Sequence, residues 1–380
     1  MNPKERVLAA MNGEAIFPVP TDVFENGVHP ELRRRLAQHF GFAESDNESL
    51  MQSFGASIRW CRPLYIGPAL EESDSHVPVY PATRMVKDIW GTWGEAAATY
   101  YDGLPRPLQN VESVADINAY PWPNPDWFDY SQVGWIMDEP EAYVPVAQWA
   151  EKFADYAKLG GGWSPIFSKA MDMYGIEQGL MCIAERPDLM EATIRHIGEF
   201  LEEYYRRFAR ACRGHLEILA WGDDFSSQRG LMLRPALWRQ WFLPIWKRLF
   251  AIAHENDMKA AFHSCGAVRA IIPDLIGAGL DILENVQTNC TGMAPQELKR
   301  EYGRELTFYG GMDTQAIMPR GSCEEVRSEV RRLIDIFGEN GRYIFTTSHY
   351  LMDDVSLENA VALYDEANSY TGAGTHSFAE

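Results

Sequence analysis

The chain has 380 residues, of which 46% are hydrophobic and 23% charged, as in an ordinary globular protein with a large core. Its formal net charge of −20 argues against nucleic acids and anionic membranes as partners, because both require a basic face. No apolar run reaches the roughly 18 residues of a membrane span, and the charged opening segment MNPKERVLAAMNGE lacks the apolar region of a signal peptide. The six scattered cysteines include no CxxC pair, so a cytoplasmic protein with reduced thiols is expected.

The first half of the chain predicts three strands and a long insertion. After an opening helix, IFPVPTD (16–22) is a good strand candidate, FGASIRW (54–60) a weaker one and AYVPVAQW (142–149) the third. Residues 62–140 are rich in Pro, Trp and Tyr, and they predict a β-hairpin with a Gly-Thr turn followed by an extended segment. Such an insertion is typical of a lid or a substrate-binding element. The Gly-rich segment 157–164 is predicted to be a flexible loop.

The second half predicts a regular alternation of strands and helices. Short apolar runs at 216–221, 259–265, 280–286, 306–311 and 342–348 alternate with helices at 188–211, 235–256, from 267 to about 277, 294–302, 323–337 and 356–369. This pattern is typical of βαβ units with a parallel sheet. With three strands from the first half, and no GxGxxG motif after any strand, it favours a single (β/α)8 TIM barrel over residues 1–380, with 62–140 as its insertion.

Polar residues stand at the ends of the predicted strands, where the active site of such a barrel lies. They are Asp22, Gln148 and Trp149, Asp223 and Asp224, His263 and Cys265, Glu284 and Asn285, Asp313, and Ser348 and His349. Zinc binds imidazole and thiolate readily, so His263, Cys265 and His349 form a candidate zinc site. Glu284 or one of the Asp residues is then a fourth ligand or a neighbouring acid.

Each of these residues also has a structural interpretation. An HxC pair is a weak signal, since a buried Cys often packs as a small hydrophobic residue. Asp223 and Asp224 have the chemistry to cap the next helix, and Asp313 has the same N-cap chemistry. His349 is equally compatible with a hydrogen-bonded polar residue beneath a loop.

Several long segments resemble the uroporphyrinogen decarboxylase superfamily, which includes decarboxylases of the haem pathway and cobalamin-dependent methyltransferases. The resemblance is carried by ERVLAAMNGE, YPWPNPDWFDYS, GDDFSSQRGLMLRPALWRQWFLP, FHSCGAVRAIIPDLIGAGLDILENVQ, ELKREYGRELTFYGGMDTQ and SHYLMDDVSLENAVALYDEA, and it covers nearly the whole chain. It implies a single (β/α)8 barrel, in agreement with the strand pattern. It also implies a homodimer, because members of the superfamily often pair their barrels.

The two branches of the superfamily differ in their motifs. The decarboxylases carry an Arg-containing RQAGRY-type motif after the first strand, which pairs the many carboxylates of their substrate, whereas this chain has TDVFENGVHPE there. The methyltransferases hold zinc on a His-x-Cys pair and a later Cys. His263 and Cys265 match the pair, and His349 stands where the family has the later Cys. With fewer thiolates the zinc is a better Lewis acid, which favours an oxygen or nitrogen leaving group.

The resemblance therefore implies an enzyme that moves a methyl group from a small methylated substrate, such as a methoxylated aromatic, to the Co(I) corrinoid of a partner protein. Glu284 or Asp224 is the expected acid beside the zinc, and Trp149, Asp223, Gln287 and Asp313 are the expected substrate contacts. Two alternatives stay open: a decarboxylase without metal, in which Asp22 or Asp224 holds a protonated intermediate, and a non-catalytic partner of a corrinoid protein.

Overall fold

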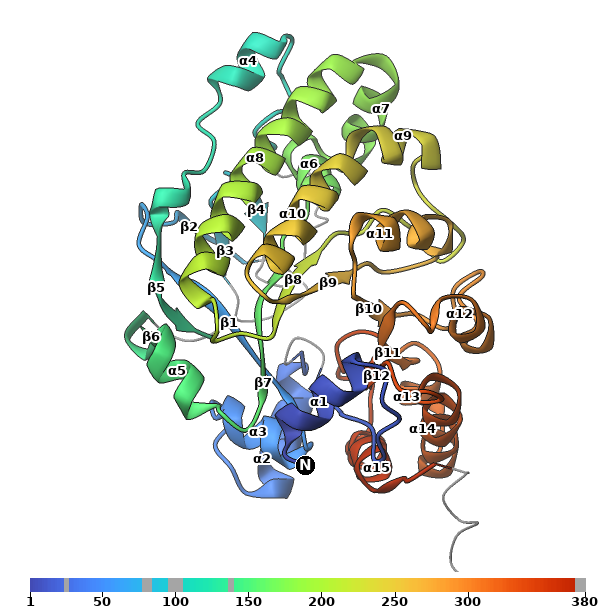
Figure 1. Cartoon of the computed structure of the whole chain (residues 1–380). Helices are drawn as coiled ribbons and strands as arrows, with labels where there is room; N and C mark the ends of the chain where they lie inside the picture. Colours follow the sequence, from blue (N-terminus) through green and yellow to red (C-terminus); the bar gives the residue numbers. More distant parts are fainter. Residues whose placement is uncertain (24–26, 77–83, 95–104, 136–139, 373–380) are drawn as a thin grey trace, which may run out of the picture.

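A computed structural model describes residues 1–23, 27–76, 84–94, 105–135 and 140–372 of the chain (Figure 1). Its centre is a barrel of parallel strands, and the order of neighbours is β12, β11, β10, β9, β8, β7 and β1. These strands are β1 (Ile58–Tyr65), β7 (Ala157–Trp163), β8 (Ile218–Gly222), β9 (Lys259–His263), β10 (Ile282–Val286), β11 (Thr307–Met312) and β12 (Tyr343–Thr347). None of the helices described is long and apolar enough to cross a membrane.

The segment predicted as the first strand (16–22) closes the barrel, although it is paired only through isolated bridges at Thr21. Thr21 forms parallel bridges to both Phe345 on β12 and Ala56, just before β1. The N–H of Asp22 donates to the carbonyl of Phe345 (2.9 Å), and the N–H of Ser57 donates to the carbonyl of Thr21 (2.7 Å). The segment around Thr21 thus takes the place between β12 and β1, and the predicted α/β barrel is confirmed.

The predicted third strand was wrong. Residues 142–149 contain only the two-residue strand β6 (Val144–Pro145), followed by the helix α5 (Val146–Lys152). The barrel strand is β7, in the Gly-rich segment predicted to be a loop. A Cβ on Gly160 would lie 2.5 Å from Leu216 Cδ1, and one on Gly161 would lie 2.4 Å from the carbonyl oxygen of Ala220. The glycines of β7 therefore permit neighbouring elements to approach closely, which β propensity does not reveal.

Helices cover the outside of the barrel, and most of those in the second half lie close to their predicted positions, although the predicted helix 235–256 is divided in two and the short helix at 317–320 was not predicted. They are α8 (Pro187–Cys212), α9 (Pro235–Trp241), α10 (Leu243–Glu255), α11 (Ile272–Ala278), α12 (Pro295–Tyr302), α13 (Ile317–Arg320), α14 (Cys323–Phe337) and α15 (Leu357–Ser369). Figure 1 shows α8 and α10 side by side. The buried faces of the helices and the outward side chains of the strands form the main core. It includes Trp221 on β8, Trp238 on α9 and Trp246 on α10.

A second, smaller core fills the barrel itself. Inward side chains of the strands form it, namely Ile58, Trp60, Leu159, Ile218, Ala220, Ala261, Ile282, Tyr309 and Ile344. The helix α1 (Pro3–Met11) contacts β1, β7 and β12, and its Val7 and Met11 belong to the same core. Because the strands begin at this end, α1 closes the bottom of the barrel and leaves the carboxyl ends of the strands as its mouth.

The insertion carries further strands and helices. The sheet β2 (Glu72–His76), β3 (Arg84–Lys87) and β4 (Trp93–Gly94) contains the predicted hairpin, with its turn at 88–92. β5 (Phe128–Gly134) pairs antiparallel with the end of β1. The shorter helices of the first half are α2 (Pro30–Phe40), α3 (Asn47–Ser53), α4 (Val114–Ala119), α6 (Phe167–Tyr174) and α7 (Ile176–Glu185).

A buried lysine fastens the hairpin to the barrel. Lys169, on α6, is 8% exposed. Its Nζ lies 2.6 Å from Asp88 Oδ2 and 3.1 Å from Thr92 Oγ1 in the hairpin turn, and 3.3 Å from Asp172 Oδ2 on α6. A buried cation requires such paired, hydrogen-bonded surroundings. The hairpin is therefore held against the helix that follows β7.

Candidate active site

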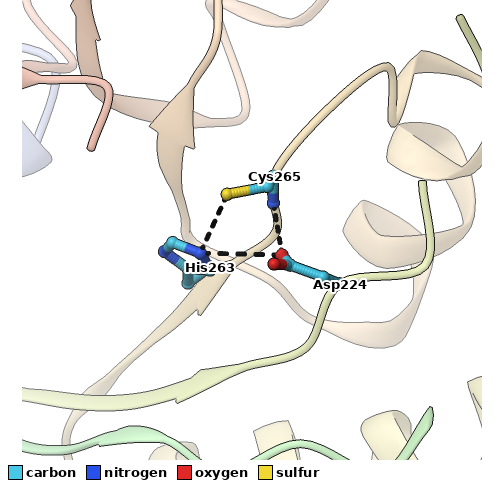
Figure 2. Close-up of side chains that lie close together, drawn as sticks. All are labelled: Asp224, His263 and Cys265. Atoms are coloured by element: carbon cyan, nitrogen blue, oxygen red, sulfur yellow. Dashed lines mark hydrogen bonds and ion pairs between the residues drawn. The ribbon is translucent and has the colours of Figure 1, made fainter. Parts of the chain in front are cut away.

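Three potential metal ligands meet at the mouth of the barrel. Asp224 follows β8, while His263 ends β9 and Cys265 lies two residues beyond, and their ligand atoms all lie within 4.8 Å of one another (Figure 2). The distance from His263 Nε2 to Cys265 Sγ is 3.5 Å, and that from His263 Nε2 to Asp224 Oδ1 is 3.7 Å. β8 and β9 are parallel neighbours, so their carboxyl ends bring these groups together.

Hydrogen bonds from both neighbouring strand ends fix the turn that carries Cys265. The Cys265 N–H donates to Asp224 Oδ1 (2.7 Å), and Ser226 Oγ donates to the Cys265 carbonyl (2.6 Å). The Gly266 N–H donates to Gln287 Oε1 (2.8 Å). Asp224 therefore both faces the thiol and positions the backbone that presents it.

Gly266 is required by this turn. Its φ is +87°, and a Cβ there would lie 2.5 Å from Ser226 Oγ and 2.7 Å from the Ser227 carbonyl oxygen. We expect Gly266→Ala to destabilise the protein by about 1–3 kcal/mol, because the strained backbone and the clash must both be relieved. Urea unfolding measures this loss. The same substitution at Gly277, where a Cβ would meet nothing within 4 Å, is the control, and equal effects of the two would contradict the argument.

Burial governs the protonation of this cluster. It raises the pKa of the Cys265 thiol well above the usual range, and the negative charge of Asp224 adds to this shift. Burial also raises the pKa of Asp224, although the hydrogen bond from the Cys265 N–H and the charge of His349 both act to lower it. Without a cation the site thus favours a neutral thiol. A bound metal ion reverses this preference, since a coordinating thiol is deprotonated.

The donor set fits zinc. Imidazole, thiolate and carboxylate are the ligands that zinc takes in proteins. For bonds of about 2.0 Å to nitrogen and 2.3 Å to sulfur, a tetrahedral zinc needs its nitrogen and sulfur donors about 3.5 Å apart. The separation of His263 Nε2 and Cys265 Sγ, 3.5 Å, matches that spacing.

His349 lies beside the cluster but outside the group of three. Burial lowers the pKa of its imidazole, and the negative charge of Asp224 opposes that shift. His349 lines a cavity of about 450 Å³ together with Cys265 and Gln287. The third group that lies with His263 and Cys265 is thus Asp224, which was predicted as an acid. The predicted ligand His349 lines the cavity that Cys265 also lines.

Glu284 and Asp22 are both buried inside the barrel. Glu284 is 1% exposed and pairs in register with His263 on the neighbouring strand. Asp22 is fully buried, and its Oδ2 accepts hydrogen bonds from Trp60 Nε1 (3.2 Å) and from the Tyr309 hydroxyl. Burial raises the pKa of Asp22 to about 7, although both hydrogen bonds oppose the shift. Asp22 is not among the described residues that line the cavity.

The buried Asp22 predicts a pH-dependent stability. Its pKa is about 7 in the folded protein, against an ordinary value of 3.8, so the folded state holds the proton more tightly. The tighter proton binding of Asp22 in the folded state stabilises the protein. This stabilisation is fully present below about pH 4 and is lost as the pH rises to about 7. We expect the stability difference between wild type and Asp22→Asn to change by about 3 kcal/mol between pH 5 and pH 8, in favour of the variant at pH 8. Urea unfolding at both pH values measures it, and parallel profiles would contradict it.

The structure places two predicted substrate contacts in the protein interior, outside the described lining of the cavity. Both carboxylate oxygens of Asp223 face the start of α6, where they accept the N–H groups of Ile166, Phe167 and Ser168 at 2.7–3.0 Å. Asp223 is fully buried and caps α6, which precedes it in the chain, whereas its structural interpretation had been a cap of the next helix. Trp149 lies on α5, not at a strand end, and it is 6% exposed in the main core.

The other two predicted contacts lie near the mouth. Gln287 is 8% exposed, lines the cavity and accepts the Gly266 N–H. Asp313 follows β11, and its Oδ1 accepts the N–H groups of Gln315 (2.7 Å) and Ala316 (3.2 Å). It stabilises the turn before α13 instead of capping that helix, whose N-cap residue is Ala316. Sequence reasoning assigned no role to Asn285, whose Nδ2 donates to Cys265 Sγ (3.1 Å). The sequence feature that could have indicated a role for Asn285 is its polar side chain in the apolar run LDILENV.

The sequence model of the uroporphyrinogen decarboxylase (URO-D) family matches residues 100–370. The chain is similar to the uroporphyrinogen decarboxylase of Pseudomonas fluorescens strain Pf-5, with 23% identity over 277 residues that cover 69% of this chain and 70% of that protein. The enzyme of the same name from Pseudomonas aeruginosa strain UCBPP-PA14 is 22% identical, with the same coverage. Among solved structures, a methyltransferase from Methanosarcina mazei shares the fold, with a TM-score of 0.58, 16% identity and coverage of 97% of this chain and 98% of the other.

Proposed function

The chain belongs to the uroporphyrinogen decarboxylase family, and from that premise we propose that it is a zinc-dependent methyltransferase. In this proposal it moves a methyl group from a small methylated substrate, such as a methoxylated aromatic ether, to the Co(I) corrinoid of a partner protein. The observation that carries the proposal is the cluster of Asp224, His263 and Cys265 at the barrel mouth. The Methanosarcina mazei methyltransferase, whose fold matches nearly the whole chain, supports this branch of the superfamily.

The chain's own residues would bind the metal and handle the proton. Asp224, His263 and Cys265 would hold the zinc, and His349, close to Asp224, is the candidate for a further protein ligand. A zinc ion there would polarise the ether oxygen and stabilise the negative charge that develops on it. Glu284, buried and in register with His263 on the next strand, would supply the proton to the departing oxygen.

The cavity beside the cluster supports a small substrate without many negative charges. Its volume of about 450 Å³ suits a small molecule. Its described lining consists of neutral polar side chains, a methionine, a tyrosine, a cysteine and a histidine, and includes no arginine or lysine. A tetrapyrrole with eight carboxylates requires cationic partners, which neither this lining nor the formal net charge of −20 provides.

The names of the curated relatives favour decarboxylation as a second candidate function. In that function a buried acid would hold a protonated intermediate without metal. The predicted residues for this role are Asp22 and Asp224. Asp22 is enclosed by Trp60 and Tyr309 and is not among the described residues that line the cavity. Decarboxylation would therefore depend on Asp224, which already belongs to the proposed metal cluster, and this makes it the weaker candidate.

One experiment separates the two functions. The zinc-loaded protein is mixed anaerobically with candidate corrinoid proteins in the Co(I) state and with methoxyarenes, methylamines or methanol in turn. We expect the change from the Co(I) to the methyl-Co(III) absorption spectrum with one substrate class. Decarboxylation of uroporphyrinogen is assayed in parallel with the same protein. Loss of carboxylates from uroporphyrinogen, with no spectral change for any methyl donor, would refute the methyltransferase proposal.

A further inference from the structure

Asn285 has an uncommon backbone conformation within a central barrel strand. Its φ is +65°, in the left-handed region that residues other than glycine seldom adopt. The pairing of β10 with β11 shifts register between Glu284 and Val286, so Asn285 is the extra residue of a β-bulge. The facing residue is Gly310, where a Cβ would lie 2.9 Å from the Val286 nitrogen. Two neighbouring strands are thus adapted to this one conformation.

The bulge directs the side chain of Asn285 at the metal cluster. Glu284, the residue before it, stays in register with His263, while Val286 belongs to the main core outside the barrel. Asn285 lies between them, and its Nδ2 donates to Cys265 Sγ at 3.1 Å. The residue is 1% exposed, and its Oδ1 has no hydrogen-bond partner in the described part of the chain. A strained backbone and a buried amide oxygen without a partner both reduce stability, and such features concentrate at functional sites.

We infer that Asn285 is a positioning residue that holds Cys265 as a metal-bound thiolate. A thiolate sulfur only accepts hydrogen bonds, and the Asn Nδ2 group only donates them. The observed contact therefore suits the metal-bound form of the cysteine, and the reversed amide would place its oxygen against a negative sulfur. The hydrogen bond orients the sulfur and offsets part of its charge. This inference rests on the proposed zinc site.

The test measures zinc affinity instead of turnover. Asn285→Gly removes the amide but suits φ +65°, so the strand is expected to keep its bulge. Asn340→Gly is the matched control, because Asn340 is also left-handed (φ +61°) but is exposed in the loop between α14 and β12. Zinc affinity is measured by competition with a chromophoric chelator. The thiolate-to-metal charge-transfer band of the Co(II)-substituted protein reports on the sulfur directly.

For Asn285→Gly we expect zinc affinity to fall by about 10- to 100-fold, as for other residues that orient metal ligands. We also expect a shift of the charge-transfer band, with unfolding by urea close to that of wild type. Asn340→Gly should leave both metal properties unchanged. Wild-type affinity and an unchanged band in Asn285→Gly would overturn the inference and leave the zinc site standing. A wild-type protein that binds no zinc overturns both this inference and the proposed function.

Discussion

Cys265→Ser is expected to lower the zinc content of the purified protein from about one ion to below about 0.1 per chain. Methyl transfer should fall by at least about a thousandfold, since a metal contributes several kcal/mol to stabilising the transition state. The serine hydroxyl does not ionise near neutral pH, so only His263 and Asp224 of the cluster remain as strong ligands. Elemental analysis and the corrinoid absorption assay measure the two effects.

Cys290→Ser is the matched control for this substitution. Cys290 is buried at the same end of the barrel, and its Sγ lies 3.5 Å from Gln287 Oε1, but it does not belong to the metal-ligand cluster. A serine retains this hydrogen bond, so the zinc content should match that of wild type. Full zinc occupancy in Cys265→Ser, or equal losses in both variants, would show that Cys265 is not a ligand.

Asp223→Ala is expected to cause the largest loss of stability, about 3–5 kcal/mol. The carboxylate accepts three backbone N–H groups at the start of α6 in a fully buried position. Its removal leaves those donors without partners, and each buried donor without a partner costs about 1–3 kcal/mol. Urea unfolding measures the change in the free energy of unfolding.

The exposed cap of α14 provides the comparison for Asp223. Ser322 accepts the N–H of Glu325 there, and Ser322→Ala should lower stability by only about 1 kcal/mol. Asp223→Ala should also weaken zinc binding, because Asp224 is the next residue and its position depends on the same loop. A loss of about 1 kcal/mol in both variants would mean that the buried donors find water or other partners.

The barrel could be predicted from the alternation of apolar runs and helices, because periodicity is a local property of the chain. The third strand could not. Segment 142–149 contains β-branched and aromatic residues but forms the two-residue strand β6 and the start of α5, whereas β7 contains three consecutive glycines. Gly160 and Gly161 are required by Leu216 and by the carbonyl of Ala220, which approach from distant parts of the sequence. Tertiary contacts of this kind override local propensity.

The candidate site could be predicted only in part, because it too depends on contacts between distant segments. His263 and Cys265 are two residues apart, so their spacing and the family resemblance identify them together. Asp224 lies 39 positions before His263 and joins the cluster only because β8 and β9 are neighbours. The contact of Asn285 depends on a bulge whose cause lies partly in Gly310 on the next strand. No pattern within a single segment contains this information.

The helix α1 has a kinetic consequence for the proposed reaction. Val7 and Met11 close the bottom of the barrel, so the proposed methyl donor and corrinoid would both have to approach the cluster through the mouth. A docked corrinoid protein would cover the route by which the small substrate enters. Binding is therefore expected to be ordered, with the methyl donor first and the corrinoid protein second, and the demethylated product should leave only after the partner has dissociated. Product inhibition patterns at varied concentrations of each reactant would reveal this order.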